Sequence, residues 1–148
     1  MESIYKSDVV VVGSGISGLM VAISLYPRKV TLVTKQKLGE MSSSAWAQGG
    51  IAAAVGTDDH PDIHFADTIK ASSGLNNEDA VRMITSEALE IVRFLEKINI
   101  QFDKDKDNNF YLSIEAAHSK RRVLKINGDQ SGKFIVEKLI KYAQSQEH

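Results

Sequence analysis

The chain opens with a hydrophobic stretch, DVVVVGSGISGLMVAISLY at residues 8–26, that carries no charge after Asp8. About 18 apolar residues are enough to span a bilayer. Glycines, however, divide this stretch into parts. Residues 9–12 are all valine, which is typical of a strand covered on both faces. Residues 19–26 predict a helix ended by Pro27, and residues 30–33 predict a second strand. The pattern therefore favours a strand–helix–strand unit over a membrane anchor.

A helix is predicted next, in the middle of the chain. Asp58 or Asp59 can cap it, and Pro61 suits its first turn. We expect it to run to Ser73 and to stop at Gly74.

A longer helix, capped by Asn76, is predicted to follow, because hydrophobic residues recur there at helical spacing. Short strands are predicted at residues 110–113 and 123–126, a turn at 127–129 and a last helix at 133–144. The hydrophobic stripe of the long helix is expected to be core and consists of Val81, Ile84, Ala88, Ile91, Leu95 and Ile98.

Composition indicates a globular protein. Of 148 residues, 43% are hydrophobic and 25% charged, and the formal net charge is −1. This charge gives no global attraction to nucleic acid or to an anionic membrane. The absence of cysteine excludes disulfides and thiolate sites and fits a reducing compartment. Residues 1–7 lack the basic region of an export signal. We expect a cytoplasmic protein with no nucleic-acid or membrane partner.

Three polar clusters resemble known kinds of site without completing one. His60 and His64 are spaced for one helix face but lack a third ligand nearby. Residues 103–107 imitate an EF-hand loop, but Asn108 replaces its glycine. Residues 120–122 are basic, and we expect them to be solvated or locally paired. No metal site is predicted.

The most informative motif is GSGISG, which matches G-x-G-x-x-G between the first strand and helix. In such a motif one glycine allows the tight turn, one lets a pyrophosphate approach and one lets the helix pack closely. The phosphate then lies at the positive helix N-terminus. A plain packing turn is the alternative. The candidate phosphate-binding residues are Gly13, Ser14, Gly15, Ile16, Ser17 and Gly18.

The acid that usually binds the ribose hydroxyls about 20 residues on is missing, which makes an ordinary NAD site less favoured. Residues 34–37 read TKQK, and the first acid after them is Glu40. Lys35 could contact the phosphates or the adenosine part of a nucleotide, or it could be a solvated surface lysine.

A second small-residue segment, SSSAWAQGGIAAA, occupies residues 42–54. Its small side chains would let the backbone lie against a flat ligand. A flexible linker is the alternative, but such a linker would not carry Ala45, Trp46 and Ile51.

Five segments in this order, DVVVVGSGISGL, VTLVTK, SSSAWAQGGIAAA, EAAHSKRRVL and GDQSG, resemble the N-terminal part of the L-aspartate oxidases. These belong to the succinate dehydrogenase and fumarate reductase flavoprotein family. The resemblance implies an α/β fold with a Rossmann-like FAD-binding start and an incomplete parallel sheet. Residues 1–148 would form the N-terminal part of the FAD-binding domain, with the capping and C-terminal domains lying outside this chain.

The implied cofactor is FAD. Residues 13–18 would cradle its pyrophosphate, and Lys35 would contact the nucleotide. Respiratory members of the family attach FAD to a histidine at the position of Ser43, so a noncovalent flavin is implied here. The segment that would wrap the flavin consists of Ser43, Ser44, Ala45, Trp46, Ala47, Gln48, Gly49 and Gly50.

The resemblance also assigns a substrate residue. Glu115 matches an acid that orients the substrate in aspartate oxidases, and a carboxylate can pair with an ammonium group while repelling a further carboxylate. The surroundings depart from the family pattern, which prefers an arginine at Ile114, a glycine pair at residues 116–117 and a threonine at Ser131.

The implied reaction oxidises L-aspartate to iminoaspartate by hydride transfer to the flavin, with oxygen or fumarate as the final acceptor. Its product would pass to quinolinate synthase in NAD biosynthesis. A succinate dehydrogenase or fumarate reductase relative, and a nucleotide-binding fragment without chemistry, are the alternatives. We expect this chain alone to be inactive, to bind FAD weakly, and to be marginally stable or to associate.

Overall fold

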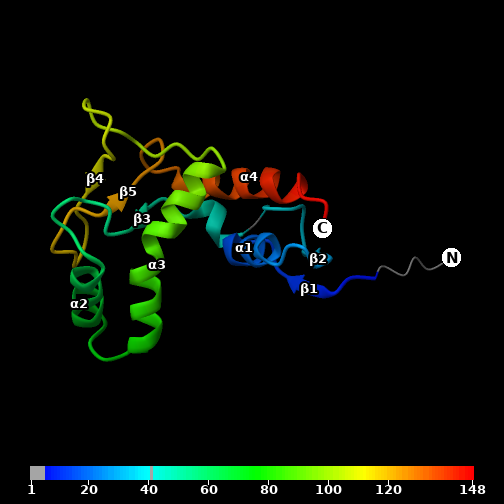
Figure 1. The fold of residues 1–148 in the computed structure, drawn as a ribbon, viewed down its shortest axis with the longest axis horizontal. Helices are drawn as coiled ribbons and strands as arrows, with labels where there is room; N and C mark the ends of the chain where they lie inside the picture. Colours follow the sequence, from blue (N-terminus) through cyan, green and yellow to red (C-terminus); the bar gives the residue numbers. More distant parts are fainter. Residues whose placement is uncertain (1–5, 41) are drawn as a thin grey trace. The chain divides into compact units, whose positions relative to one another are not determined.

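The computed structural model describes residues 6–40 and 42–148, and these form two compact units (Figure 1). The first unit contains residues 6–40, 42–47 and 132–148, and the second contains Gln48–Ser131. No helix among the described residues is long and apolar enough to cross a membrane.

The first unit contains the predicted strand–helix–strand start. Strands β1 (Val9–Val12) and β2 (Val30–Val33) pair in parallel, with their first and last residues opposite each other. Helix α1 (Ile16–Ser24) joins them and contacts both strands. It buries Leu19 and Ala22. The helix begins three residues before the predicted start, because it includes the last part of the glycine motif.

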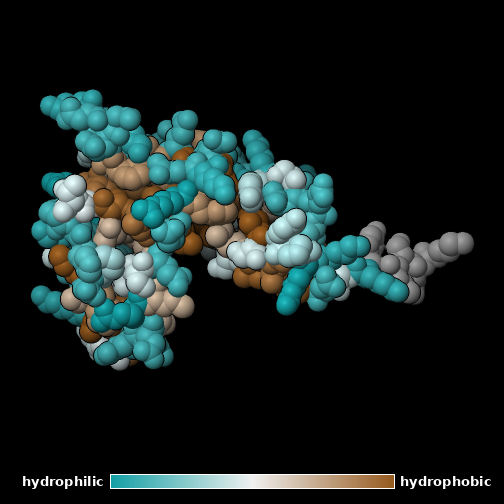
Figure 2. Space-filling model, in the orientation of Figure 1, coloured by the Kyte–Doolittle hydropathy of each residue, from teal (hydrophilic) through white to brown (hydrophobic). Residues whose placement is uncertain are grey.

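The expectation that β1 is covered on both faces is wrong for the described chain. Its valines alternate between half-buried and exposed, and Val12 is 82% exposed. Among the described residues, β1 pairs only with β2, and α1 is the only helix with several contacts to it. Figure 2 shows hydrophobic atoms at the surface around α1 and β1.

The rest of the first unit comes from two later segments. The segment after β2 contains a 3-10 turn, η1 (Ser43–Trp46), and the chain returns to this unit in helix α4 (Ser131–Gln144) from Gly132 onward. The buried side of α4 carries Ile135, Val136 and Leu139. Helix α4 starts two residues earlier than predicted.

The second unit combines a helix pair and a small sheet. Helices α2 (Pro61–Ser72) and α3 (Glu78–Lys97) are in contact, and Figure 1 shows α3 running back along α2 after a short turn. Strands β3 (Ile51–Ala52), β4 (Leu112–Ser113) and β5 (Val123–Leu124) form an antiparallel sheet in the order β3–β5–β4. The predicted segments 110–113 and 123–126 therefore contain β4 and β5, which are shorter.

Both predicted caps in this unit are displaced. His60, not Asp58 or Asp59, caps α2, because its ring Nδ1 accepts from the Asp62 backbone N–H at 3.2 Å. Asn77, rather than Asn76, caps α3 through its side-chain oxygen.

The predicted core stripe of α3 is partly wrong. Ile84 and Ile91 are exposed, whereas Thr85 and Val92 are buried. Thr85 can take a buried position because its hydroxyl donates to the backbone carbonyl of Val81 at 2.9 Å. Four members of the stripe are buried as predicted: Val81, Ala88, Leu95 and Ile98.

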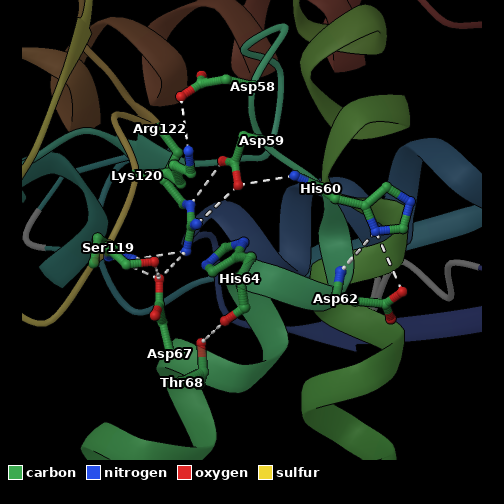
Figure 3. A network of polar contacts seen from close by, with 11 residues as sticks. Asp58, Asp59, His60, Asp62, His64, Asp67, Thr68, Ser119, Lys120 and Arg122 are labelled. Carbon is green, nitrogen blue, oxygen red and sulfur yellow. Dashed lines mark hydrogen bonds and ion pairs between the residues drawn. The ribbon is translucent and has the colours of Figure 1, made fainter.

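The second unit contains a fully buried cation. Arg122, directly before β5, has no solvent exposure and forms two parallel hydrogen bonds of 2.8 Å to Asp59. It donates a further 2.8 Å bond to Asp67 on α2. Figure 3 shows the guanidinium between the two carboxylates. Removing one partner of such a buried pair typically costs about 3–5 kcal/mol. The network therefore fixes β5 to α2, and of the two expectations for residues 120–122, solvated or locally paired, local pairing is confirmed at Arg122.

Two histidines border this cluster. His118 Nδ1 lies 3.3 Å from the Arg122 guanidinium, and its ring contacts the ring of His64 edge to face. His64 is buried, and its Nδ1 has no hydrogen-bond partner among the described residues. Burial first, and then the positive charge of Arg122, lowers the pKa of His64. Asp59 and Asp67 oppose this shift only in part.

This arrangement predicts a loss of stability in mild acid. Because the pKa of His64 is lower in the folded chain, the unfolded chain binds more protons as the pH falls below about 6.5. Stability from this group is complete above that pH and decreases below it, by at most about 1.4 kcal/mol per pH unit. We expect His64→Phe to reduce this slope in urea unfolding between about pH 6.5 and 5. His60→Asn, which keeps a cap acceptor on an exposed residue, should not reduce it.

The exposed face of β1 predicts self-association of this chain. Val10 and Val12 present an apolar surface beside a strand edge that has no partner strand among the described residues, which favours contact with another copy. We expect the double variant Val10→Thr, Val12→Thr to lower the apparent mass in light scattering while keeping the circular dichroism spectrum. An unchanged mass would show that this face does not drive association.

Candidate functional site

The turn between β1 and α1 depends on two glycines. Gly13 has φ +106°, a region that side chains with a Cβ rarely adopt, and its N–H donates to Val33 O at 2.8 Å. A Cβ on Gly18 would lie 2.0 Å from the carbonyl oxygen of Gly13. The helix backbone therefore touches the turn directly, and only glycine permits this approach.

The N-terminus of α1 is open to an anion. Its cap residue is Gly15, so no cap side chain accepts from the first helical N–H groups, and the first turn contains no acid. The Ile16 N–H donates to Ser44 Oγ at 3.2 Å. A Cβ on Gly15 would lie 3.3 Å from the same hydroxyl oxygen. Backbone donors and a hydroxyl group thus gather at the positive end of the helix dipole.

Ser14 connects this turn to the segment after β2. It is buried, and its hydroxyl lies 2.8 Å from the hydroxyl of Thr34. The Gly39 N–H also donates to Ser14 Oγ at 3.4 Å. These contacts place the segment that carries Lys35 beside the glycine-rich turn.

Parts of the glycine-rich turn, of the segment after β2 and of the serine segment line one cavity of about 420 Å³ in the first unit. Six predicted site residues lie there: Gly13, Ser14, Gly15, Lys35, Ser43 and Ser44. Sequence reasoning missed Thr34, Gln36, Glu40 and Ser42, which also line it. Glu40 lies beyond the usual position of a ribose-binding acid, and no local pattern shows that the loop after β2 returns to the glycines.

The serine segment is ordered by its own hydrogen bonds. Ser42 caps η1, because its hydroxyl accepts from the Ala45 N–H at 3.2 Å. The Ala47 carbonyl accepts from the Gly132 N–H at 3.1 Å. A Cβ on Gly132 would lie 2.1 Å from Ser44 O, so α4 starts in direct contact with this backbone. The segment is therefore a supported part of the first unit.

The other predicted flavin-wrapping residues are spread over different surroundings. Ala45 and Trp46 line a separate cavity of about 570 Å³ with residues of α4, and Trp46 is 75% exposed. Gln48, Gly49 and Gly50 belong to the second unit. A Cβ on Gly50 would lie 2.0 Å from Leu124 O, whereas Gly49 has free space around its Cα.

Glu115 lies in the second unit just after β4. Its Oε1 accepts from Ser113 Oγ at 3.0 Å and forms an ion pair with Lys125 Nζ at 2.9 Å. The hydrogen bond from Lys125, followed by that from Ser113, lowers the pKa of Glu115. Ala116 has φ +49°, a left-handed conformation that favours glycine. The left-handed turn that begins after Glu115 therefore forms with alanine at this position.

The donor set of the first cavity fits a dinucleotide pyrophosphate. It combines a helix N-terminus without acidic residues, a glycine at position 15 whose missing side chain leaves the backbone accessible, serine hydroxyl groups and the cation of Lys35. These groups are the donors that phosphate oxygens require. Glu40 adds one acceptor suited to hydroxyl groups.

Known proteins match this chain over most of its length. L-aspartate oxidase of Agrobacterium fabrum is 50% identical over 130 residues, which cover 88% of this chain and 25% of that protein. L-aspartate oxidase of Saccharolobus solfataricus is 42% identical over 89% of this chain and 26% of its own length. The chain thus spans about a quarter of the length of these curated relatives.

Solved structures give the same fold. The Sdh1 complex of Mycobacterium smegmatis matches with a TM-score of 0.84 and 33% identity, over 90% of this chain and 23% of that one. An E. coli quinol fumarate reductase matches with a TM-score of 0.87 and 22% identity, over 95% and 24% of the two chains. The predicted α/β fold of a flavoprotein FAD-binding domain is therefore confirmed.

The family model described as "FAD binding domain" matches residues 8–148, which is nearly the whole chain. The predicted cofactor is confirmed by this match and by the relatives. The chain belongs to the FAD binding domain family, and its cofactor is FAD.

Proposed function

We propose that this chain is the N-terminal, FAD-binding part of an L-aspartate oxidase that converts L-aspartate to iminoaspartate. One observation carries the proposal: the chain is 50% identical to a curated L-aspartate oxidase, compared with 33% for the Sdh1 structure. Residues 1–148 would then belong to one FAD-binding domain that is completed by further sequence.

The residues of the glycine-rich turn would bind the cofactor pyrophosphate. The N–H groups at the start of α1 would donate to its oxygens, and Ser14 would hold the turn against Thr34 through their 2.8 Å contact. Lys35 would add a positive charge beside the nucleotide. Gly13 and Gly18 would act indirectly, by allowing the backbone path.

The segment 43–50 would surround the flavin ring, which supplies the acceptor for the hydride removed from the substrate. Serine at position 43 supports noncovalent binding, because its hydroxyl cannot form the histidyl link of respiratory relatives. This is the feature in the described site that separates the two enzyme classes chemically.

Glu115 would orient the substrate by pairing with its ammonium group. Its side chain is 43% exposed, so an incoming cation can reach the carboxylate. Its lowered pKa keeps it ionised at neutral pH, as an ammonium partner requires. A dicarboxylate that lacks the ammonium group would lose this interaction and meet repulsion instead.

The wider reaction is also part of the proposal. Oxygen or fumarate would reoxidise the enzyme, and quinolinate synthase would take up iminoaspartate for NAD biosynthesis. The cysteine-free composition is compatible with the reducing cytoplasm. The second candidate is a succinate dehydrogenase flavoprotein, which the likeness to the Sdh1 structure favours.

The first test is anaerobic reduction of the whole flavoprotein that contains this chain. We expect L-aspartate to bleach its visible flavin absorbance, because the substrate ammonium group can pair with Glu115, and we expect succinate to leave the absorbance unchanged. Acid precipitation should release the flavin into solution, in keeping with serine at position 43. Bleaching by succinate alone would instead assign the protein to the dehydrogenase class.

The glycine-rich turn can be tested separately. We expect Gly18→Ala to lower FAD affinity at least tenfold, about 1.4 kcal/mol, because its Cβ would collide with the Gly13 carbonyl and displace the helix N-terminus. Fluorescence titration of the apoprotein with FAD measures this change. Gly56→Ala is the matched control, since its Cβ would make ordinary contacts of 3.4 Å in the second unit. Unchanged affinity in Gly18→Ala would contradict phosphate binding at this turn.

A further inference from the structure

We infer that Lys125 is a positioning residue for substrate recognition, which holds the Glu115 carboxylate in one orientation for the substrate ammonium group. The inference rests on the proposed function, since it concerns how Glu115 would meet L-aspartate. It assigns a role to a lysine that sequence motifs did not single out.

The small sheet explains why the two side chains meet. Strands β4 and β5 are antiparallel, and Ser113 lies opposite Val123. Glu115 follows β4 by two residues, and Lys125 follows β5 directly. Both Ser113 and Lys125 reach Glu115 Oε1.

The contact between Glu115 and Lys125 is short and partly shielded from solvent. Lys125 Nζ lies 2.9 Å from Glu115 Oε1, and the lysine side chain is only 24% exposed. Partial burial reduces solvent screening of the two charges. The pKa of Glu115 is lowered and the pKa of Lys125 is raised, in each case mainly by their mutual hydrogen bond. Both groups therefore stay charged at neutral pH.

The local charge suits a cationic ligand. Lys125 also lies 3.7 Å from Asp129, so the three side chains together carry a net charge of −1. The contacts from Ser113 and Lys125 both involve Oε1 of Glu115. An ammonium group that approaches Oε2 does not have to displace either of them.

Fixing the carboxylate in advance should strengthen substrate binding. An unsupported glutamate side chain samples several rotamers, and ordering it upon binding weakens affinity by about two- to tenfold. Lys125 would remove this cost before the substrate arrives. Because it acts through Glu115, its loss should raise KM for L-aspartate more than it changes kcat.

The test uses the whole flavoenzyme that contains this chain and steady-state kinetics with L-aspartate. We expect Lys125→Met to raise KM about tenfold with less than a twofold change in kcat, and Lys125→Arg to restore KM to within about threefold. The acid limb of the kcat/KM profile should move to higher pH in Lys125→Met, because the carboxylate loses its cation. Lys120→Met is the matched control, since Lys120 forms an ion pair of the same 2.9 Å length with Asp58. Its KM should stay unchanged.

A double variant separates positioning from direct substrate binding. In a Glu115→Gln background, Lys125→Met should have little further effect on KM. Inhibition by succinate, which has no ammonium group, should be weakened less than twofold by Lys125→Met. Independent effects of the two substitutions, or a large loss of succinate binding, would show that Lys125 binds a substrate carboxylate itself and would overturn the inference.

Different results would reject the proposed function and the role of Lys125. If the wild-type enzyme does not oxidise L-aspartate, the proposed function and this inference fall together before any variant is made. If it does, and Lys125→Met matches Lys120→Met in KM and pH profile, only the role of Lys125 is rejected.

Discussion

The second unit depends on the pairing of one buried cation. Arg122 has no contact with solvent, and a charge in that position is tolerated only when carboxylates surround it. Asp59, just before α2, and Asp67, within α2, meet this need, while Arg122 lies directly before β5, the central strand of the small sheet. The same strand leads to Lys125 and pairs with the strand before Glu115. The ion-pair network of Arg122 therefore supports the strands next to Glu115, although it does not contact the Glu115 carboxylate itself.

The first unit is organised by close contacts between backbone atoms, whereas the second unit is organised by a buried ion pair. Gly18 and Gly13 touch, and Gly132 touches the backbone of η1, at distances that leave no room for a Cβ. Such contacts bring hydroxyl groups and N–H groups from distant parts of the chain into one cavity, with Ser44 reaching Ile16 as the clearest example. The site is thus made mainly of backbone and small side chains, which suits a large anionic cofactor.

The local sequence pattern was sufficient to predict the elements that form from residues adjacent in the sequence. The valine run, the glycine motif and the second strand correspond to β1, the turn with α1, and β2. The sequence could not show which face of β1 is covered, because coverage depends on tertiary partners. It also placed Ile84 and Ile91 in the core, although the helix is rotated so that Thr85 and Val92 face inward.

In the candidate site, too, some residues can be predicted from the sequence and others cannot. Lys35 and Ser43 are predicted from the family resemblance, and the structure places both at one cavity. Glu40 is not predicted as a site residue, because it lies beyond the usual position of a ribose-binding acid. No local pattern shows that its loop turns back. Asp58 or Asp59 is predicted to cap α2, but the Asp59 carboxylate pairs with Arg122, 63 positions further along the chain. Pairings at such separation cannot be read from a local pattern.

The first unit is discontinuous, and this has a consequence for how the protein is made. Its strands and α1 appear early in synthesis, but the residues of α4 that pack on Gly39 and η1 come only after the whole of Gln48–Ser131. At roughly 5–20 residues per second, the ribosome needs several seconds to deliver them. The backbone of His148, which accepts from Val30, comes later still. During translation the glycine-rich turn and the strands of the first unit therefore remain without α4, and the inserted second unit can fold first.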